Sequence, residues 1–258
     1  MNEPLVSVVV IAYNSADYIL ETLESIAGQT YENIELVVAD DASSDETVAI
    51  TRKWMQEHGD RFHGCILNDA EKNQGIPGNL NAGIRRAGGK YIKTIAADDL
   101  LLPNCIADNV KGCEDMQVPY LFTWLVKFTD TPEGRKQWEE APNLAFYQAD
   151  PATQHKMLLR KNQIYGPLFF FEKAFWEEMG TYDEHYRMLE DYPMWIRMAD
   201  KGLKFHFLNV PTVAYRISDT SVSNGSGRRV VNVRYFQCYR KFFYDMVFPE
   251  LVRRGMFL

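Results

Sequence analysis

The first hundred residues alternate between two patterns that few folds accommodate. Runs rich in β-branched residues, such as 5–13 (LVSVVVIAY) and 34–40 (IELVVAD), are continuously apolar, as strands buried on both faces must be. Between these runs apolar residues recur at helical spacing, so that Ile19, Leu23 and Ile26 would share one face of a helix. Strict alternation of strand and helix predicts a doubly wound, mainly parallel α/β sheet with helices on both sides.

The two patterns continue to residue 96 and fade after residue 103, and no internal repeat or low-complexity linker interrupts the chain. The expected strands are 5–13, 34–40, 64–69, 90–96 and 120–128, a strand followed by a helix in 165–180, and two short strands around Pro211. The expected helices are 16–29, 43–59 (opened by a capping box from Ser43 to Glu46), 78–89, 151–161 and 190–202, and residues 130–150 are expected to form a loop.

Composition excludes several classes of protein. The chain is 46% hydrophobic and 24% charged, as ordinary globular proteins are, and its net charge of −7 disfavours nucleic acid as a partner. No apolar run approaches the roughly 20 residues of a membrane span, and the start does not resemble a signal peptide, so we expect a cytoplasmic protein. The four cysteines form no CxxC pair and the five histidines have no ligand spacing. Any metal should therefore be held by carboxylates.

Two pairs of adjacent aspartates follow predicted strands. The first acid pair is Asp40 and Asp41, and the second acid pair is Asp98 and Asp99. Ligands bind at the carboxyl ends of the strands in a doubly wound sheet, so both pairs should rim one crevice. Adjacent carboxylates repel each other unless a cation lies near them, and Mg²⁺ or Mn²⁺ with phosphate oxygens would relieve that repulsion.

Each acidic pair also has a purely structural interpretation, and the residues alone leave both open. The second acid pair could favour the positive end of a helix dipole that follows it. The first acid pair could form a turn and an N-cap. Further along, Glu190 and Asp191 could occupy the first turn of an amphipathic helix whose core face carries Met194, Trp195 and Met198.

Three motifs resemble the family 2 glycosyltransferases, inverting enzymes of the GT-A fold. VSVVVIAYN resembles their first strand, DDASSDET their second-strand motif, and NQGIPGNLNAGIRRAGGKYIKTIAADD the stretch that ends at their metal-binding Asp pair. The resemblance is strong over 5–103 and weaker to about residue 220. It implies a hexosyltransferase of the kind that builds bacterial polysaccharides such as O-antigen. It also implies one domain over 1–220, with a Rossmann-like nucleotide-binding half (1–103) fused to an acceptor-binding half (104–220).

On the donor side the resemblance implies a nucleotide-diphosphate sugar, with UDP as the first choice. Tyr13 would pack on the base, Asp41 would read its edge, Asp98 would contact the ribose, and Asp99 would bind Mn²⁺ or Mg²⁺ on the diphosphate. Three further residues complete the expected donor side, namely Ala12, Asp40 and Arg216, the last as a phosphate contact or equally as a structural salt bridge. Three positions depart from the family, because Ala12 stands in place of a Pro, Leu80 in place of an Arg and Ser218 in place of a His.

On the acceptor side, MLEDYPMWIRM resembles the family's ED motif, which implies that Asp191 is the general base. Glu190 would assist the acceptor or cap the helix, and Trp195 would lie on the acceptor side. One base and one displacement at the anomeric carbon give inversion. The implied acceptor is a saccharide or a lipid-linked saccharide.

The C-terminal segment differs in charge from the rest of the chain. Residues 228–258 hold seven Arg and Lys against two acids, which is +5 locally and leaves −12 elsewhere. Because aromatic residues alternate with the cations at helical spacing, we expect 221–258 to be a helical segment that contacts an anionic membrane surface at the inner face of the plasma membrane. Alternatively, its aromatics pack on the body and its cations are solvated. The sequence also leaves open whether the chain forms a homo-oligomer.

Three rival classes share part of this pattern. A signalling receiver domain also has an acid pair after a strand, but this chain has an extra strand and helix before its first pair. A nucleotidyltransferase usually has a glycine-rich, cationic loop after its first strand, and IAYNSADYIL has neither feature. The third rival is a sugar-nucleotide-binding protein without catalysis.

Overall fold

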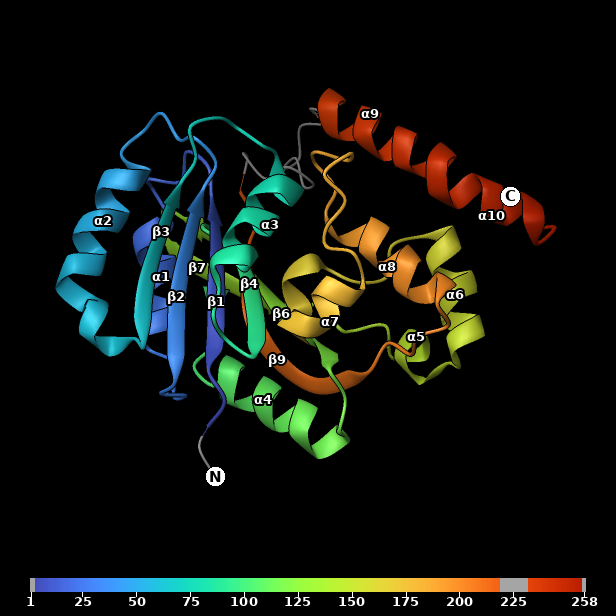
Figure 1. The fold of residues 1–258 in the computed structure, drawn as a ribbon, viewed down its shortest axis with the longest axis horizontal. Coiled ribbons are helices and arrows are strands. Elements are labelled where there is room, and N and C mark those ends of the chain that lie inside the picture. Colours follow the sequence, from blue (N-terminus) through green and yellow to red (C-terminus); the bar gives the residue numbers. More distant parts are fainter. Residues whose placement is uncertain (1–2, 219–231, 257–258) are drawn as a thin grey trace.

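The computed structural model describes residues 3–218 and 232–256, and these residues build one mixed sheet with helices on both faces (Figure 1). The strand order is β3-β2-β1-β4-β8-β6-β9-β5, with β7 paired to β6. The strands are β1 (Val6–Ala12), β2 (Ile34–Asp40), β3 (Gly64–Asp69), β4 (Tyr91–Ala96), β5 (Leu100–Leu101), β6 (Tyr120–Thr131), β7 (Gly134–Glu139), β8 (Phe169–Glu172) and β9 (Phe207–Arg216).

The α-helices are α1 (Ile19–Ala27), α2 (Thr47–His58), α3 (Ile76–Arg86), α4 (Cys105–Met116), α5 (Leu144–Gln148), α6 (Pro151–Arg160), α7 (Lys173–Glu178), α8 (Asp191–Asp200), α9 (Val233–Phe242) and α10 (Phe248–Arg253). Two short 3-10 turns, η1 (Gly59–Arg61) and η2 (Gly166–Leu168), and one π-helical turn, η3 (Phe243–Val247), complete the helical elements of the described residues.

The parallel half confirms the predicted doubly wound sheet. β1 pairs in parallel with β2 on one side and with β4 on the other, so the strand order reverses beside β1. Alternate residues of β1 face opposite cores: Val9 packs in the cluster that includes residues of α3, while Val8 and Val10 pack in the cluster that includes residues of α1. Both faces are buried, which explains the continuous apolar runs.

The second half extends the same sheet with antiparallel pairs. β8 pairs antiparallel with both β4 and β6, and β6 pairs in parallel with β9. Helices α5 to α8 cover one face of these strands with a core rich in aromatic side chains, in which Phe122 and Phe169 stack with ring centroids 4.9 Å apart. The two halves therefore form a single sheet and share their cores.

Two predictions of secondary structure in the second half were wrong. Residues 130–150 are not a loop, because β6 turns at Gly134 (φ 121°) into β7, and α5 follows. All six residues of β7 are exposed, so the strand has no apolar pattern that would reveal it. The two strands expected around Pro211 are one strand, β9. Proline fits there because its partner strand shifts register on both sides of Trp124, which pairs with Pro211.

The capping box was also wrong. The N-cap of α2 is Glu46, and no side chain caps it. The Ser43 hydroxyl instead donates to Asp40 Oδ2 at 2.5 Å, and Asp45 Oδ1 accepts the Thr47 backbone amide at 3.1 Å. The helix-dipole interpretation of the second acid pair is wrong as well, because β5 intervenes before α4, whose N-cap is Asn104.

The C-terminal elements α9, η3 and α10 follow one another along the outer surface, above α8 and α6 in Figure 1. Their inner side is anchored by Phe242, Val247 and Leu251, which are buried in the larger core. The predicted boundary between residues 220 and 221 and the cations Arg228 and Arg229 lie outside the described residues. Among the described helices, none has the length and apolar character needed to span a bilayer.

Candidate active site

A cavity of about 590 Å³ lies where the carboxyl end of β4 meets the start of α8. Its wall includes Asp98 and Asp99 after β4, and Glu190 and Asp191 at the beginning of α8. The structure therefore brings the second acid pair and the predicted general base into one space, although about ninety residues separate them in the sequence.

The second acid pair is held by the end of β9. Asp99 is 2% exposed, and its Oδ1 accepts the backbone amide of Arg216 at 2.8 Å. The Arg216 Nε donates to the Asp98 carbonyl oxygen at 2.8 Å, and Thr22 Oγ1 donates to the Asp99 carbonyl oxygen at 2.8 Å. These bonds fix the backbone of the pair and leave the carboxyl groups without an ion pair among the described residues.

The electrostatics of this pair favour a bound cation. Burial raises the pKa of Asp98, while the Arg216 charge opposes that rise. Burial raises the pKa of Asp99 well above its ordinary value, and the Asp98 charge raises it further. Ionised carboxylates are therefore costly here unless positive charge arrives with a ligand.

Arg216 is committed to structural partners. The side chain is 3% exposed, its Nη2 lies 2.5 Å from Glu21 Oε2, and its Nη1 pairs with Asp130. The guanidinium also lies over the rings of Phe128 and Tyr18, at 4.5 and 4.8 Å from their centroids. These contacts favour the salt-bridge interpretation, and a phosphate contact stays a prediction.

The first acid pair does not line the cavity, and its carboxylates hold loops instead. Asp40 accepts the Ser43 amide at 2.7 Å and the Ser43 hydroxyl at 2.5 Å, which is the predicted turn. Asp41 accepts the amides of Gln74 and Gly75 at 2.6 and 2.9 Å. Burial raises the pKa of Asp41, and these two amides oppose the rise. The expectation that both pairs rim one crevice is thus met only by the second pair.

The end of β1 offers a different surface. Ala12 is buried, and its carbonyl oxygen accepts the Asp41 amide at 2.9 Å. Tyr13 follows it and is 54% exposed, which leaves its ring accessible to a flat ligand. Neither residue lines the cavity, so their predicted contacts with the nucleotide stay predictions.

Glu190 and Asp191 line the cavity from the start of α8. Asp191 Oδ1 accepts the Tyr192 amide at 2.5 Å, and its Oδ2 accepts Asn162 Nδ2 at 3.0 Å. Burial raises the pKa of Asp191 to about 6, despite these donors. Burial and the neighbouring Asp191 charge raise the pKa of Glu190 to about 8. Of the two, Asp191 is thus the stronger acid and loses its proton first as the pH rises.

Two supporting residues were missed by the sequence analysis. A Cβ on Gly166 would lie 3.1 Å from Glu190 Oε1, closer than most Cβ contacts, and 3.4 Å from Asp191 Cβ, which is an ordinary contact, so glycine at this position leaves the Glu190 carboxyl its space. Lys93 is fully buried in β4 and donates its Nζ to the carbonyl oxygen of Pro167, which fixes the η2 turn. A lysine inside an otherwise apolar strand was the one signal available for this role.

Trp195 does not lie on the acceptor side. The side chain has no exposed surface and meets the rings of Phe122 and Phe169 edge to face, with centroids 5.0 and 4.9 Å apart. Trp195 is therefore a core residue, as the amphipathic interpretation of this helix predicts. It does not line the cavity that Asp191 lines.

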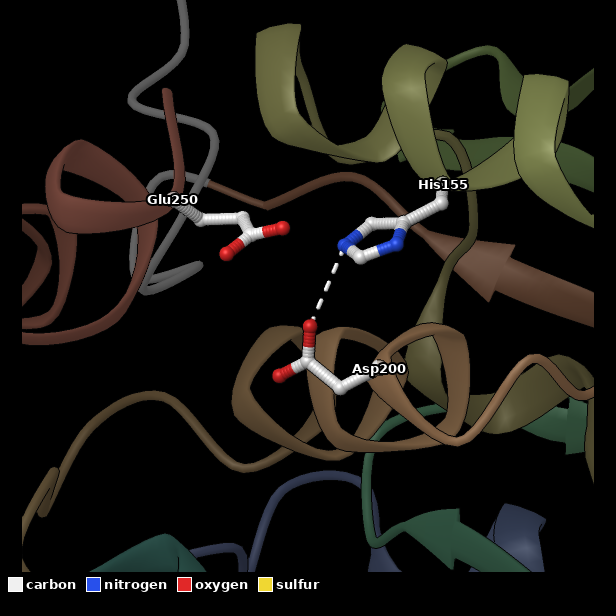
Figure 2. Close-up of side chains that lie close together, drawn as sticks. All are labelled: His155, Asp200 and Glu250. Atoms are coloured by element: carbon white, nitrogen blue, oxygen red, sulfur yellow. Dashed lines mark ion pairs between the residues drawn. The ribbon is translucent and has the colours of Figure 1, made fainter. Parts of the chain in front are cut away.

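A second cluster of ionisable groups joins the C-terminal helices to the body (Figure 2). His155 Nε2 lies 3.2 Å from Asp200 Oδ1, and one oxygen of Glu250 completes a set of ligand atoms within 4.8 Å of one another. However, Arg254 Nη2 lies 2.9 Å from His155 Nδ1, and Glu250 pairs with both Arg253 and Arg254. A metal-bound histidine directs its other ring nitrogen to an acceptor, so these donors favour an ion-pair network that secures α10.

Solved structures define the class of fold. The described chain superposes on Staphylococcus aureus TarS in complex with UDP-GlcNAc with a TM-score of 0.67, at 19% identity, covering 92% of this chain and 65% of that one. It also superposes on the mannosyltransferase PcManGT from Pyrobaculum calidifontis in complex with GDP-Man and Mn²⁺, with a TM-score of 0.63, at 20% identity, covering 98% of this chain and 65% of that one. The architecture is the GT-A fold.

The family model described as glycosyl transferase family 2 matches residues 7–176, which is more than half of the chain. The chain therefore belongs to family 2 of the glycosyltransferases, and it is a transferase by class.

Curated relatives agree with this assignment. An uncharacterized glycosyltransferase of Rickettsia prowazekii is 27% identical over 75% of this chain and 58% of its own length. The UDP-Glc:α-D-GlcNAc-diphosphoundecaprenol β-1,3-glucosyltransferase WfaP of Escherichia coli is 26% identical over 88% and 83% of the two chains. The putative teichuronic acid biosynthesis glycosyltransferase TuaG of Bacillus subtilis is 26% identical over 86% and 82%. The chain thus spans less than two thirds of the Rickettsia protein.

Proposed function

We propose that the chain transfers a hexose from a nucleotide-diphosphate sugar, in the first instance a UDP-sugar, to a lipid-linked saccharide in bacterial polysaccharide synthesis, with inversion. The observation that carries this proposal is the presence of Asp98, Asp99 and Asp191 in the wall of one cavity. The donor and acceptor in the name of WfaP, and the UDP-GlcNAc bound to TarS, support this choice of substrates.

The donor end fits a divalent cation. Its donor set is carboxylate oxygen, which Mg²⁺ and Mn²⁺ prefer, and one oxygen of Asp99 is already oriented by the Arg216 amide. Asp99 would hold the ion and Asp98 would accept hydrogen bonds from the ribose. When bound, the cation stabilises the negative charge that develops on the departing diphosphate. The Mn²⁺ complex of PcManGT supports this assignment.

The acceptor end supplies the base. The acceptor hydroxyl oxygen forms a bond to the anomeric carbon while the bond from that carbon to the diphosphate oxygen breaks, and the hydroxyl proton passes to Asp191. Asn162 and the Tyr192 amide orient the carboxylate for this transfer. Glu190, which keeps its proton at neutral pH, donates a hydrogen bond to an acceptor hydroxyl. Attack from the face opposite the diphosphate inverts the anomeric centre.

The nucleotide base would lie beyond the cavity, near the ends of β1 and β2. The exposed Tyr13 ring stacks on the base in this arrangement. The Asp41 carboxylate accepts two backbone amides and uses a remaining lone pair to accept a hydrogen bond from the base edge. Ala12 and Asp40 shape the loops around this contact. Arg216 contributes by holding the second acid pair in place.

The proposal is tested by titrating UDP-, GDP- and dTDP-sugars into the protein by calorimetry with and without Mn²⁺, followed by turnover on a diphospholipid-linked saccharide. We expect Asp191→Asn to bind the donor like the wild type and to lose turnover at least about a thousandfold, the range for loss of a general base. Asp108→Asn on α4, outside the cavity, is the matched control. Donor binding without turnover in the wild type would indicate a binding protein and contradict the proposal.

A further inference from the structure

The C-terminal helices have a second face that the body does not cover. While Phe242, Val247 and Leu251 anchor the inner face, large apolar side chains stand exposed on the outer one. These exposed residues are Val233 (62%), Phe236 (54%), Tyr244 (59%), Phe248 (45%) and Val252 (49%). The described structure thus leaves an unpartnered apolar stripe along α9, η3 and α10, hereafter the outer stripe.

The π-helical turn affects how the residues of the outer stripe are distributed around the helix axis. From Phe236 onward its members, with Arg240 between them, recur every fourth residue. On an α-helix of about 3.6 residues per turn such a series drifts around the axis. The wider turn η3 (Phe243–Val247) counteracts this drift. The exposed apolar residues therefore stay closer to one side of the C-terminal helices than they would on a continuous α-helix.

Cations border the outer stripe. The exposed basic residues of 232–256 are Arg234, Arg240, Lys241, Arg253 and Arg254, against two acids, Asp245 and Glu250. Glu250 is already paired with Arg253 and Arg254. Arg234 and Arg240, on the same turns as Phe236, make no ion pair among the described residues. Residues 232–256 thus combine exposed aromatic rings with a net charge of +3.

The outer stripe begins next to the cavity. Tyr235 lies on α9 between Val233 and Phe236, yet its side chain faces inward and lines the cavity together with Glu190 and Asp191. Burial is the main cause that raises the pKa of Tyr235 to about 12, and the charges of these two acids add to the rise. A surface that contacts the outer stripe would therefore lie within one helical turn of the acceptor end of the cavity.

We propose that the outer stripe docks on an anionic phospholipid bilayer and so holds the acceptor end of the cavity at the membrane surface. Aromatic side chains flanked by Arg and Lys on one side of a helix match the chemistry of a lipid headgroup layer. A second copy of this chain is a poorer occupant, because a two-fold contact would bring two basic surfaces together. This inference rests on the proposed lipid-linked acceptor.

The test is co-sedimentation of the full chain with phosphatidylcholine vesicles, with and without phosphatidylglycerol. We expect binding only to the anionic vesicles, and weaker binding at high salt. The combined variant Phe236→Ala, Tyr244→Ala, Phe248→Ala should reduce vesicle affinity about tenfold or more, which is about 1.4 kcal/mol. Arg234→Gln with Arg240→Gln should remove the preference for anionic lipid. Trp138→Ala, an exposed aromatic on β7, is the matched control.

Two further readouts separate this inference from the proposed function. All variants should bind the sugar nucleotide normally and act normally on a water-soluble acceptor analogue, because none of the altered residues lines the cavity. If no donor binds any form, the proposed function fails while vesicle binding still reports on the outer stripe. Equal binding to neutral and anionic vesicles, an unchanged triple variant, or a dimer that buries Phe236 would each overturn the inference.

Discussion

The backbone amide of Arg216 donates to Asp99 Oδ1 at 2.8 Å across 117 residues of sequence. The same residue donates its Nε to the Asp98 carbonyl oxygen, while its terminal nitrogens pair with Glu21 and Asp130. The last residue of β9 therefore positions both members of the second acid pair through their backbone and one carboxylate oxygen. Because the Arg216 guanidinium is paired with Glu21 and Asp130, it does not neutralise the second acid pair. The pair is therefore suited to a cation that the donor brings.

Asp99→Asn should stabilise the protein without ligand and abolish its metal response. Folding raises the pKa of Asp99, so the native state holds its proton above the pH at which the unfolded chain has lost it, and stability falls as pH rises through that window. Asparagine removes this cost and keeps the bond to the Arg216 amide. We expect a Tm higher by roughly 2–4 °C at neutral pH. The Mn²⁺-dependent shift with UDP-sugar should disappear in the same thermal scan.

Arg216→Gln should destabilise the fold by about 2 kcal/mol, because it leaves Glu21 and Asp130 without their buried partner; both acids are partly exposed, which limits the cost. Arg135→Gln is the matched control, because Arg135 pairs with the same two acids but is itself more exposed. It should cost less than about 1 kcal/mol. Urea unfolding measures both values, and equal costs would contradict the central position given to Arg216.

The acidic limb of the pH profile should report Asp191. A base works only when ionised, so kcat/KM should fall tenfold per pH unit as the pH drops below about 6, the pKa of Asp191. Glu190→Gln should keep activity within about tenfold at pH 7, since Glu190 is already protonated there. A wild-type profile that is flat down to pH 4.5 would be incompatible with this base.

Gly166→Ala should lower turnover more than donor binding. The added Cβ would lie 3.1 Å from Glu190 Oε1 and would press on that side chain, and none of its three nearest atoms belongs to the second acid pair. We expect kcat/KM for the acceptor to fall about tenfold or more with an unchanged donor Kd, as misplacement of catalytic groups does. Gly64→Ala, at a position where a Cβ meets no atom within 4 Å, should leave both quantities unchanged.

Much of the fold was readable from the sequence because its first half is built from local repeats. The boundaries predicted for β2 and β3 are those observed, since an apolar run bounded by turn residues marks a strand, which is fully buried in β2 and partly buried in the edge strand β3. The roles predicted for Asp98, Asp99 and Asp191 in one active site came from the family resemblance. The structure shows these three residues in one cavity wall. Their chemical roles stay predictions.

Other residues could not be assigned in this way. Trp195 and Asp191 lie one helical turn apart, and only the packing of α8 against Phe122 and Phe169 decides that the first is core and the second faces the cavity. For Asp41 the sequence predicted a carboxylate at a strand end, but not the backbone amides of Gln74 and Gly75 that donate to it. Such contacts depend on segments that are distant in the chain.

By itself, then, the sequence determined the order of strands and helices up to residue 96, the position of the second acid pair at a strand end, and the amphipathic character of the C-terminal helices. These features follow from hydrophobic periodicity, which is a local property of the chain. Only the tertiary structure decided that Arg216 holds Asp98 and Asp99, that Gly166 makes room for Glu190, and which face of α9 meets the cavity. Those outcomes depend on long-range packing, where steric fit and burial select one partner among many that the sequence allows.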